Sequence, residues 1–139
     1  MILKLIDGEI VMSYENPIVI RHQFASHDFG AGAGAEAIKG IAGLKGRSID
    51  CGLSEISEVF NGVTTTGKLN VGIAAAGAEY IAMDLAAAAV SDVFNTQDDT
   101  DAIVLADIPA DTQVEVTFVA PTGGTPTGIG RPYVDIAWY

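Results

Sequence analysis

Three carboxylates lie close together in a polar segment at residues 95–101, namely Asp98, Asp99 and Asp101. Calcium takes its ligands from carboxylate oxygens, so these side chains could contribute to a calcium site that distant residues complete. The spacing lacks both the glycine and the terminal glutamate of an EF-hand loop. A solvated acidic loop explains the same residues more simply. We therefore predict no metal site, and these aspartates are the candidates if calcium binds.

A second group of side chains that bind metals comprises His22, His27 and Asp28. Imidazole groups bind transition metals and exchange protons near neutral pH. If residues 18–25 form a strand, His22 projects from that strand, whereas His27 follows its end. Nothing in this spacing requires the side chains to converge, and we expect ordinary surface or interface histidines.

Nucleophilic catalysis finds little support in the sequence. Cys51 is the only cysteine, and we expect it on the inward face of a strand, where cysteine packs as a small apolar residue. One cysteine allows neither an internal disulfide nor a cysteine-rich zinc site. There is no Gly-x-Ser-x-Gly elbow, and a solvent-facing surface explains Glu55 and Glu58. We therefore predict a protein that is not an enzyme and needs no cofactor.

The spacing Gly30-x-Gly32-x-x-Ala35 imitates a dinucleotide-binding fingerprint, with Asp50 about twenty residues beyond Gly30. In that fingerprint the glycines open a helix whose backbone amides bind a pyrophosphate. Here further glycines, up to residue 46, interrupt the only segment in which that helix would fit. The chain also lacks alternating strands and helices, so we reject this interpretation.

The elements that must position these residues begin with short strands. Residues 2–6 and 9–12 are expected to be strands joined by the turn dipeptide Asp7-Gly8. Residues 18–25 are expected to form a strand after Pro17, because proline is tolerated at the first position of a strand. We group residues 1–25 as the N-terminal strands.

Residues 26–46 are rich in glycine and alanine, with Gly30, Gly32 and Gly34 in an almost pure Gly/Ala run. Backbone entropy makes such a segment reluctant to form a regular element by itself. We predict an extended arm or long loop that becomes ordered mainly through contact with another surface. Lysines within it give it local positive charge.

The remaining residues, 47–139, are predicted to form a β-sandwich body. Ile49, Cys51 and Leu53 alternate with polar or small residues, which predicts a strand with these three side chains inward. Further elements are expected as strands at 68–73 and 102–105 and as one short helix or irregular crossing at 74–93.

The clearest alternation lies near the end of the chain. Residues 113–120 and 133–138 each place apolar side chains on one face, and we expect these two strands to pair as an antiparallel hairpin across the Gly/Thr/Pro loop 121–130. The pattern predicts a mainly β protein: one domain, an antiparallel β-sandwich or jelly roll of about 7–8 short strands.

The charge distribution restricts the partners. The formal net charge of −11 opposes binding to nucleic-acid phosphates and to anionic membranes. Residues 1–68 carry six basic and eight acidic residues, whereas residues 69–139 carry only Arg131 against ten acids. No segment is typical of a signal peptide or approaches the length of a membrane span. We therefore expect synthesis in a cytoplasm.

Three segments, in order, resemble small virion structural proteins of tailed bacteriophages, of the capsid decoration or cement type. They are Thr-Gly-Lys-Leu-Asn-Val-Gly at 66–72, Leu-Ala-Asp-Ile-Pro-Ala-Asp-Thr-Gln-Val-Glu-Val-Thr-Phe at 105–118, and Gly-Ile-Gly-Arg-Pro-Tyr-Val-Asp-Ile-Ala-Trp at 128–138. The resemblance runs from Thr65 onward, which is about half of the chain, and is one of pattern without a diagnostic motif. It implies a β-sandwich or jelly-roll body on the outer capsid surface, bound to the major capsid protein and often trimeric.

Candidate contact residues follow from combining this resemblance with the composition. The arm would touch the shell or neighbouring subunits through Gly30, Gly32, Gly34, Lys39, Lys45 and Arg47. The terminal aromatic residues Tyr133, Trp138 and Tyr139 would pack in a fold or subunit interface. Two alternatives remain: a head-fibre or tail module that binds host glycans through those aromatics, or a metal-binding β-sandwich protein.

Overall fold

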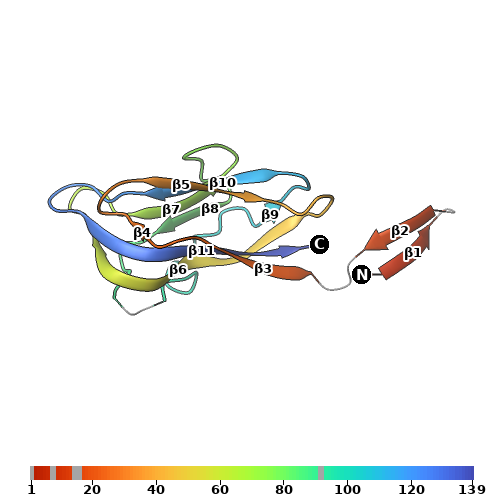
Figure 1. Cartoon of the computed structure of the whole chain (residues 1–139), viewed down its shortest axis with the longest axis horizontal. Coiled ribbons are helices and arrows are strands. Elements are labelled where there is room, and N and C mark those ends of the chain that lie inside the picture. Colours follow the sequence, from red (N-terminus) through yellow and green to blue (C-terminus); the bar gives the residue numbers. More distant parts are fainter. Residues whose placement is uncertain (1, 7–8, 14–16, 91–92) are drawn as a thin grey trace.

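The described backbone consists of strands and turns and contains no α-helix (Figure 1). A computed structural model describes residues 2–6, 9–13, 17–90 and 93–139, with side chains from residue 17 onward within these ranges. The strands are β1 (Ile2–Ile6), β2 (Glu9–Ser13), β3 (Ile18–Gln23), β4 (His27–Asp28), β5 (Gly34–Lys39), β6 (Gly46–Asn61), β7 (Lys68–Gly72), β8 (Ile81–Asp84), β9 (Asp107–Ile108), β10 (Gln113–Val119) and β11 (Thr127–Trp138).

Nine of these strands form two antiparallel sheets, which confirms the predicted sandwich-like β fold. One sheet has the order β5-β10-β7-β8, and the other has the order β3-β11-β6-β9 with β4 also paired to β11. The strands β1 and β2 pair only with each other, at the predicted positions, and Figure 1 shows this hairpin beyond β3 and apart from the two sheets. The predicted turn Asp7-Gly8 lies outside the described residues.

The core lies between the two sheets and follows the predicted alternation in β10. In β11 the predicted inner face is buried as well, but Tyr133 and Ala137 on the opposite face are also buried. Every second side chain of β10, from Val114 through Val116 to Phe118, is buried. On β11, Val134, Ile136 and Trp138 are buried against them, as part of one core cluster. Because a strand alternates faces with period two, the sequence pattern was sufficient to identify this face.

The prediction for Ile49 is wrong, since its side chain is 45% exposed while Cys51 and Leu53 are fully buried. The cause is a β-bulge: Asp50 pairs with Asp135 and Ser48 with Ile136, so Ile49 is an extra residue in β6. A bulge reverses the facing of the residues before it. Two more register shifts follow along β6, and Figure 1 shows β6 and β11 curving together.

The structure contradicts the predicted arm at residues 26–46. Residues 34–39 are β5, which pairs with β10 over six positions from Lys39↔Gln113 to Phe118↔Gly34. Upstream, β4 pairs with β11. The entropic cost of fixing glycine and alanine is offset because β10 pairs with β5 along its whole length and Ile38 is buried in the core.

Gly34 explains why this strand is poor in large side chains. A Cβ atom there would lie 2.7 Å from His27 Cε1 and 2.9 Å from Phe118 Cδ2. Small residues therefore allow β5 to approach the aromatic cluster that His27 and Phe118 form with Phe29. The composition reflects close packing within the chain rather than an unpacked segment.

The expected hairpin between the last two long strands is also wrong. β10 and β11 belong to different sheets, and the intervening segment crosses from one sheet to the other. Gly123 and Gly124 have positive φ angles of 85° and 66°, which place a turn inside this crossing. Alternation indicates which side chains of a strand face the core, but it carries no information about which strand is its neighbour.

No helix occurs at residues 74–90, the described part of the segment where we allowed one. Instead Ile81–Asp84 forms β8, with Ile81 and Met83 buried at strand spacing. The predicted strand at 102–105 is reduced to a single bridge between Ile103 and Ile81, and the regular pairing begins later at β9. Alanine-rich composition favoured a helix, but the sheet partner β7 determined the structure.

Candidate functional site

Two carboxylates of the acidic segment 95–101 accept backbone hydrogen bonds, within the segment and from the end of β8. Asp98 Oδ2 accepts a hydrogen bond from the Asn95 backbone N–H at 2.9 Å. Asp99 Oδ2 accepts one from the Asp84 N–H at 2.9 Å, and its Oδ1 accepts one from the Asp101 N–H at 3.3 Å. Within the described residues, no three histidine, cysteine or carboxylate side chains gather closely enough to hold a metal ion.

The two histidines do not converge. His22 lies opposite Val134 and His27 opposite Gly130, four positions apart on β11 and therefore roughly 14 Å apart along the strand. Trp138 Nε1 donates to His22 Nε2 at 3.3 Å, and His27 Nε2 lies 2.9 Å from the Gly32 carbonyl oxygen. Burial lowers the pKa of His22, and the nearby Asp135 charge opposes this effect.

The three candidate glycines lie in and beside the tight loop 29–33. A Cβ on Gly30 would lie 2.7 Å from the Pro126 carbonyl oxygen, and Gly34 is enclosed as described above. Gly32 alone faces open space, since no atom lies within 4 Å of its Cβ position. Contacts within the chain therefore account for Gly30 and Gly34. The absence of a helix after this loop agrees with our rejection of a dinucleotide fingerprint.

Two of the three candidate interface aromatics are buried inside the chain. Tyr133 and Trp138 are each 1% exposed, whereas Tyr139 is 41% exposed. The Trp138 indole fills the end of the core, where a Cβ on Gly46 would lie 2.9 Å from its ring. Tyr133 and Trp138 are therefore unavailable to a glycan or a neighbouring subunit, and only Tyr139 keeps that role.

Tyr133 belongs to a polar network on the outer face of its sheet that the sequence did not reveal. Its hydroxyl donates to Asp50 Oδ2 at 3.0 Å, and Asp50 Oδ1 accepts from Thr96 Oγ1 at 2.8 Å. The Arg21 guanidinium lies 4.0 Å from the centre of the Tyr133 ring and donates to both oxygens of Asp135, at 2.8 and 2.9 Å. The sequence carried no signal for this network, because Asp50 and Asp135 face each other only through the register of β6 and β11.

These contacts make the network stabilising rather than reactive. Burial, and secondly Asp50, raise the pKa of Tyr133, so its phenol stays protonated. Hydrogen bonding to Asp135 raises the pKa of Arg21. Burial raises the pKa of the neighbouring Cys51 thiol to about 12, which keeps it from acting as a thiolate nucleophile near neutral pH.

The three basic candidates lie together at one end of the sandwich. Lys39 ends β5, Lys45 lies in the following turn and Arg47 lies at the start of β6. Figure 1 shows this turn, the loop before β10 and the C-terminal residue at the same end. The sequence correctly grouped the charges but assigned them to an arm, whereas the structure presents them on a turn between paired strands.

Two open hollows lie at this basic end. One has a volume of about 330 Å³ and is lined by Lys39, Gly40, Ala42, Asp111, Thr112 and Gln113. The other has a volume of about 300 Å³ and is lined by Lys45, Asp107, Ile108, Pro109 and Tyr139. Both volumes lie at the lower limit of small-molecule sites, which are more enclosed.

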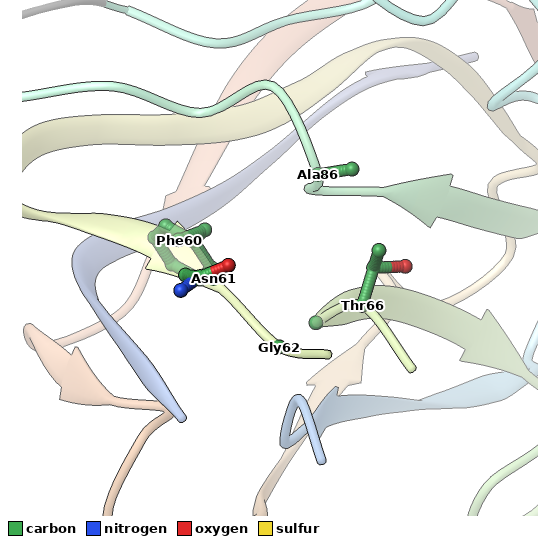
Figure 2. Close-up of a pocket in the computed structure, with 6 residues that line it drawn as sticks. Phe60, Asn61, Gly62, Thr66 and Ala86 are labelled. Carbon is green, nitrogen blue, oxygen red and sulfur yellow. The ribbon is translucent and has the colours of Figure 1, made fainter. Parts of the chain in front are cut away.

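A third hollow, of about 140 Å³, lies between the end of β6, the start of β7 and the loop after β8. Figure 2 shows Phe60 and Asn61 on one side of it and Thr66 and Ala86 on the other. The Phe60 ring packs against the Phe29 ring, with ring centres 4.9 Å apart. This space is below the range of small-molecule sites and would accept at most one side chain.

The fold and these surfaces define an all-β, sandwich-like protein whose accessible features are loops and shallow hollows. Neither a protein-family model nor any curated protein or solved structure matches the chain. In the part of the chain that the structure describes, no helix is long and apolar enough to cross a membrane.

Proposed function

We propose that this chain is a capsid decoration protein of a tailed bacteriophage, which acts by binding and not by catalysis. It attaches to the major capsid protein on the outer surface of the virion, as a homotrimer, after synthesis in the host cytoplasm. The strongest support for this proposal is the position, in the fold, of the segments that resemble decoration proteins. Its three segments coincide with β7, with β9 and β10, and with β11, and therefore with strands from both sheets.

The architecture supports a binding role in physical terms. Paired strands on both sides fix the loops at each end of the sandwich, so little conformational entropy is lost when a loop docks. A trimer would present three identical contacts to a symmetric shell, and linked contacts reinforce each other through effective concentration. The glycan-binding alternative loses its main support because Tyr133 and Trp138 are buried.

The test is co-sedimentation of the purified protein with expanded capsids that lack decoration. We expect saturable binding at stoichiometric ratios, with unexpanded procapsids as the comparison, and a trimeric mass for the free protein by light scattering. Failure to bind expanded capsids under conditions where the protein is folded would refute the proposal. A monomeric mass together with saturable binding would refute only the trimer.

A further inference from the structure

The two histidines of the chain make hydrogen bonds of opposite sense. The Trp138 indole N–H donates to His22 Nε2 at 3.3 Å, and because an indole nitrogen is only a donor, this Nε2 must be unprotonated. His27 Nε2 lies 2.9 Å from the Gly32 carbonyl oxygen, which only accepts, so that nitrogen must carry its proton. A protonated imidazole donates from both nitrogens. Protonation therefore abolishes the His22 bond and leaves the His27 bond intact.

The Trp138 indole is enclosed on the side away from His22. Trp138 is 1% exposed, and its ring meets the His22 ring edge-on, with 5.9 Å between centres and 85° between planes. The six-membered part of the indole lies against the turn 40–45, since Cβ atoms on Gly40 and Gly46 would lie 3.2 and 2.9 Å from Cζ3. Protonation of His22 would therefore point two N–H groups at each other and leave a buried indole donor without an acceptor.

The strand that carries His22 is the part of this contact that is easiest to displace. In the described part of the chain, β3 lies at the edge of its sheet and pairs with β11 alone. At its start, Ile18 and Val19 are 39% and 58% exposed. Segments with few buried apolar side chains open at a lower free energy than the core does. An unfavourable contact at His22 is therefore relieved by local opening of β3.

One neighbouring charge acts on His22. Burial lowers the pKa of His22, and the smaller effect of Asp135 on β11 raises it. Arg21 binds both oxygens of Asp135 and so offsets part of that charge. Other charged residues lie on the segments around the turn 40–45 and do not contribute to this shift, namely Glu36, Lys39, Lys45 and Arg47. The pKa of His22 therefore lies below its ordinary value of 6.5.

We propose that the contact between His22 and Trp138 is a pH switch for the edge strand β3, which opens when His22 Nε2 gains a proton. With His22 neutral, the indole N–H is satisfied and β3 pairs with β11 from Tyr133↔Gln23 to Trp138↔Ile18. With His22 charged, the indole N–H loses its acceptor, and β3 separates from β11 locally. This inference concerns the fold alone and does not rest on the proposed function.

The first test needs no variant. Long-range ¹H–¹⁵N NMR spectra of the wild-type protein at about pH 8, where both histidines are neutral, identify the protonated nitrogen of each ring. We expect the proton on Nδ1 of His22 and on Nε2 of His27, as their bonds require. A proton on Nε2 of His22 would overturn the inference, because that nitrogen could not then accept from Trp138.

The second test follows the indole N–H of Trp138, which gives a single NMR peak because the chain has one tryptophan. In the wild type this peak should shift with pH, with a midpoint below 6.5. His27→Gln is the matched control and should reproduce that titration, whereas His22→Gln should abolish it. A peak that does not move in the wild type, or that moves equally in the His22→Gln variant, would show that His22 does not control the contact.

Hydrogen exchange tests the opening of the strand. The β3 amides should exchange faster than the β10 amides, which shows that β3 opens by itself. Between about pH 7 and about pH 5, after correction for intrinsic exchange, β3 should lose protection roughly two- to tenfold in the wild type, the equivalent of one hydrogen bond. His22→Gln should show no such loss. Equal protection of β3 and β10, or equal losses in the two proteins, would each overturn the proposed switch.

Discussion

Replacing Asp50 with alanine should destabilise the fold by about 3 kcal/mol, although Asp50 lies on the outer face of a sheet. The carboxylate accepts hydrogen bonds from the Tyr133 hydroxyl, from Thr96 and from the Cys51 backbone. The Tyr133 side chain is 1% exposed, and a buried hydroxyl that loses its acceptor costs roughly 1–3 kcal/mol. Each lost bond to Thr96 and Cys51 adds about 1 kcal/mol. Relief of repulsion with Asp135, directly opposite, offsets part of this cost.

A double-mutant cycle isolates the Tyr133 contribution. In the Tyr133→Phe background no hydroxyl is left without a partner, so Asp50→Ala should cost less there by about 1.5 kcal/mol. Urea unfolding followed by Trp138 fluorescence measures all four proteins, because Trp138 is the only tryptophan and is buried in the core. If Asp50→Ala costs the same in both backgrounds, the hydrogen bond contributes no coupling and our account of the network is wrong.

The Asp50–Tyr133 pair also predicts how stability changes with pH in the alkaline range. The pKa of Tyr133 is raised in the folded state, chiefly by burial and then by Asp50, above its ordinary value of 10.0. This contribution to stability is present below pH 10 and is lost as pH rises further, because only the unfolded chain then ionises freely. The Tyr133→Phe variant should lose less stability above pH 10 than the wild type. An unchanged alkaline slope would contradict the assignment.

Three shorter predictions test other parts of the structure. Gly52 and Gly32 have the same φ angle of 157°, but their surroundings differ: a Cβ on Gly52 would overlap the Phe94 carbonyl oxygen, whereas a Cβ on Gly32 would contact nothing. In urea unfolding, Gly52→Ala should therefore destabilise the protein by about 2–3 kcal/mol more than Gly32→Ala. Because burial lowers the pKa of His22, the stability of the folded protein should fall as pH drops below 6.5. The His22→Gln variant should lose less stability than the wild type between pH 7 and 5, and an equal loss in both proteins would contradict this prediction. Trypsin should cleave the native protein slowly within residues 26–46 and rapidly in urea. Rapid cleavage of the native protein there would instead support the predicted arm.

The sequence predicted which faces are buried better than which strands are neighbours. Period-two alternation in β10 and β11 identified Val114, Val116 and Phe118 and their counterparts, because burial of one face is a local property of a strand. Pairing depends on contacts distant in sequence. The apparent hairpin partners β10 and β11 therefore lie in different sheets. The bulge at Ile49 inverted a third pattern, and no composition signal marked it.

The candidate sites show the same division. Clustering of Lys39, Lys45 and Arg47 could be predicted because they lie within nine consecutive positions. The Asp50–Tyr133 contact could not, because its two residues are 83 positions apart and meet only through the register of β6 and β11. Aromatic side chains near the end of the chain suggested an interface, but their types are equally suited to a core, and only burial distinguishes the two.

Replacing an arm with a paired strand changes what a partner contact at the basic end would cost. A disordered segment that folds on binding loses roughly 1–2 kcal/mol of backbone entropy for each residue it orders. If residues 26–46 were free, that cost would consume much of the interaction energy of a surface with only a few charges. In this fold the ladder between β5 and β10 has already ordered the segment, and the Gly43–Asp111 and Lys45–Tyr139 bonds fix the turn beyond it. A partner that contacts this turn would therefore meet a segment that is already ordered, so this entropic cost would not reduce its affinity.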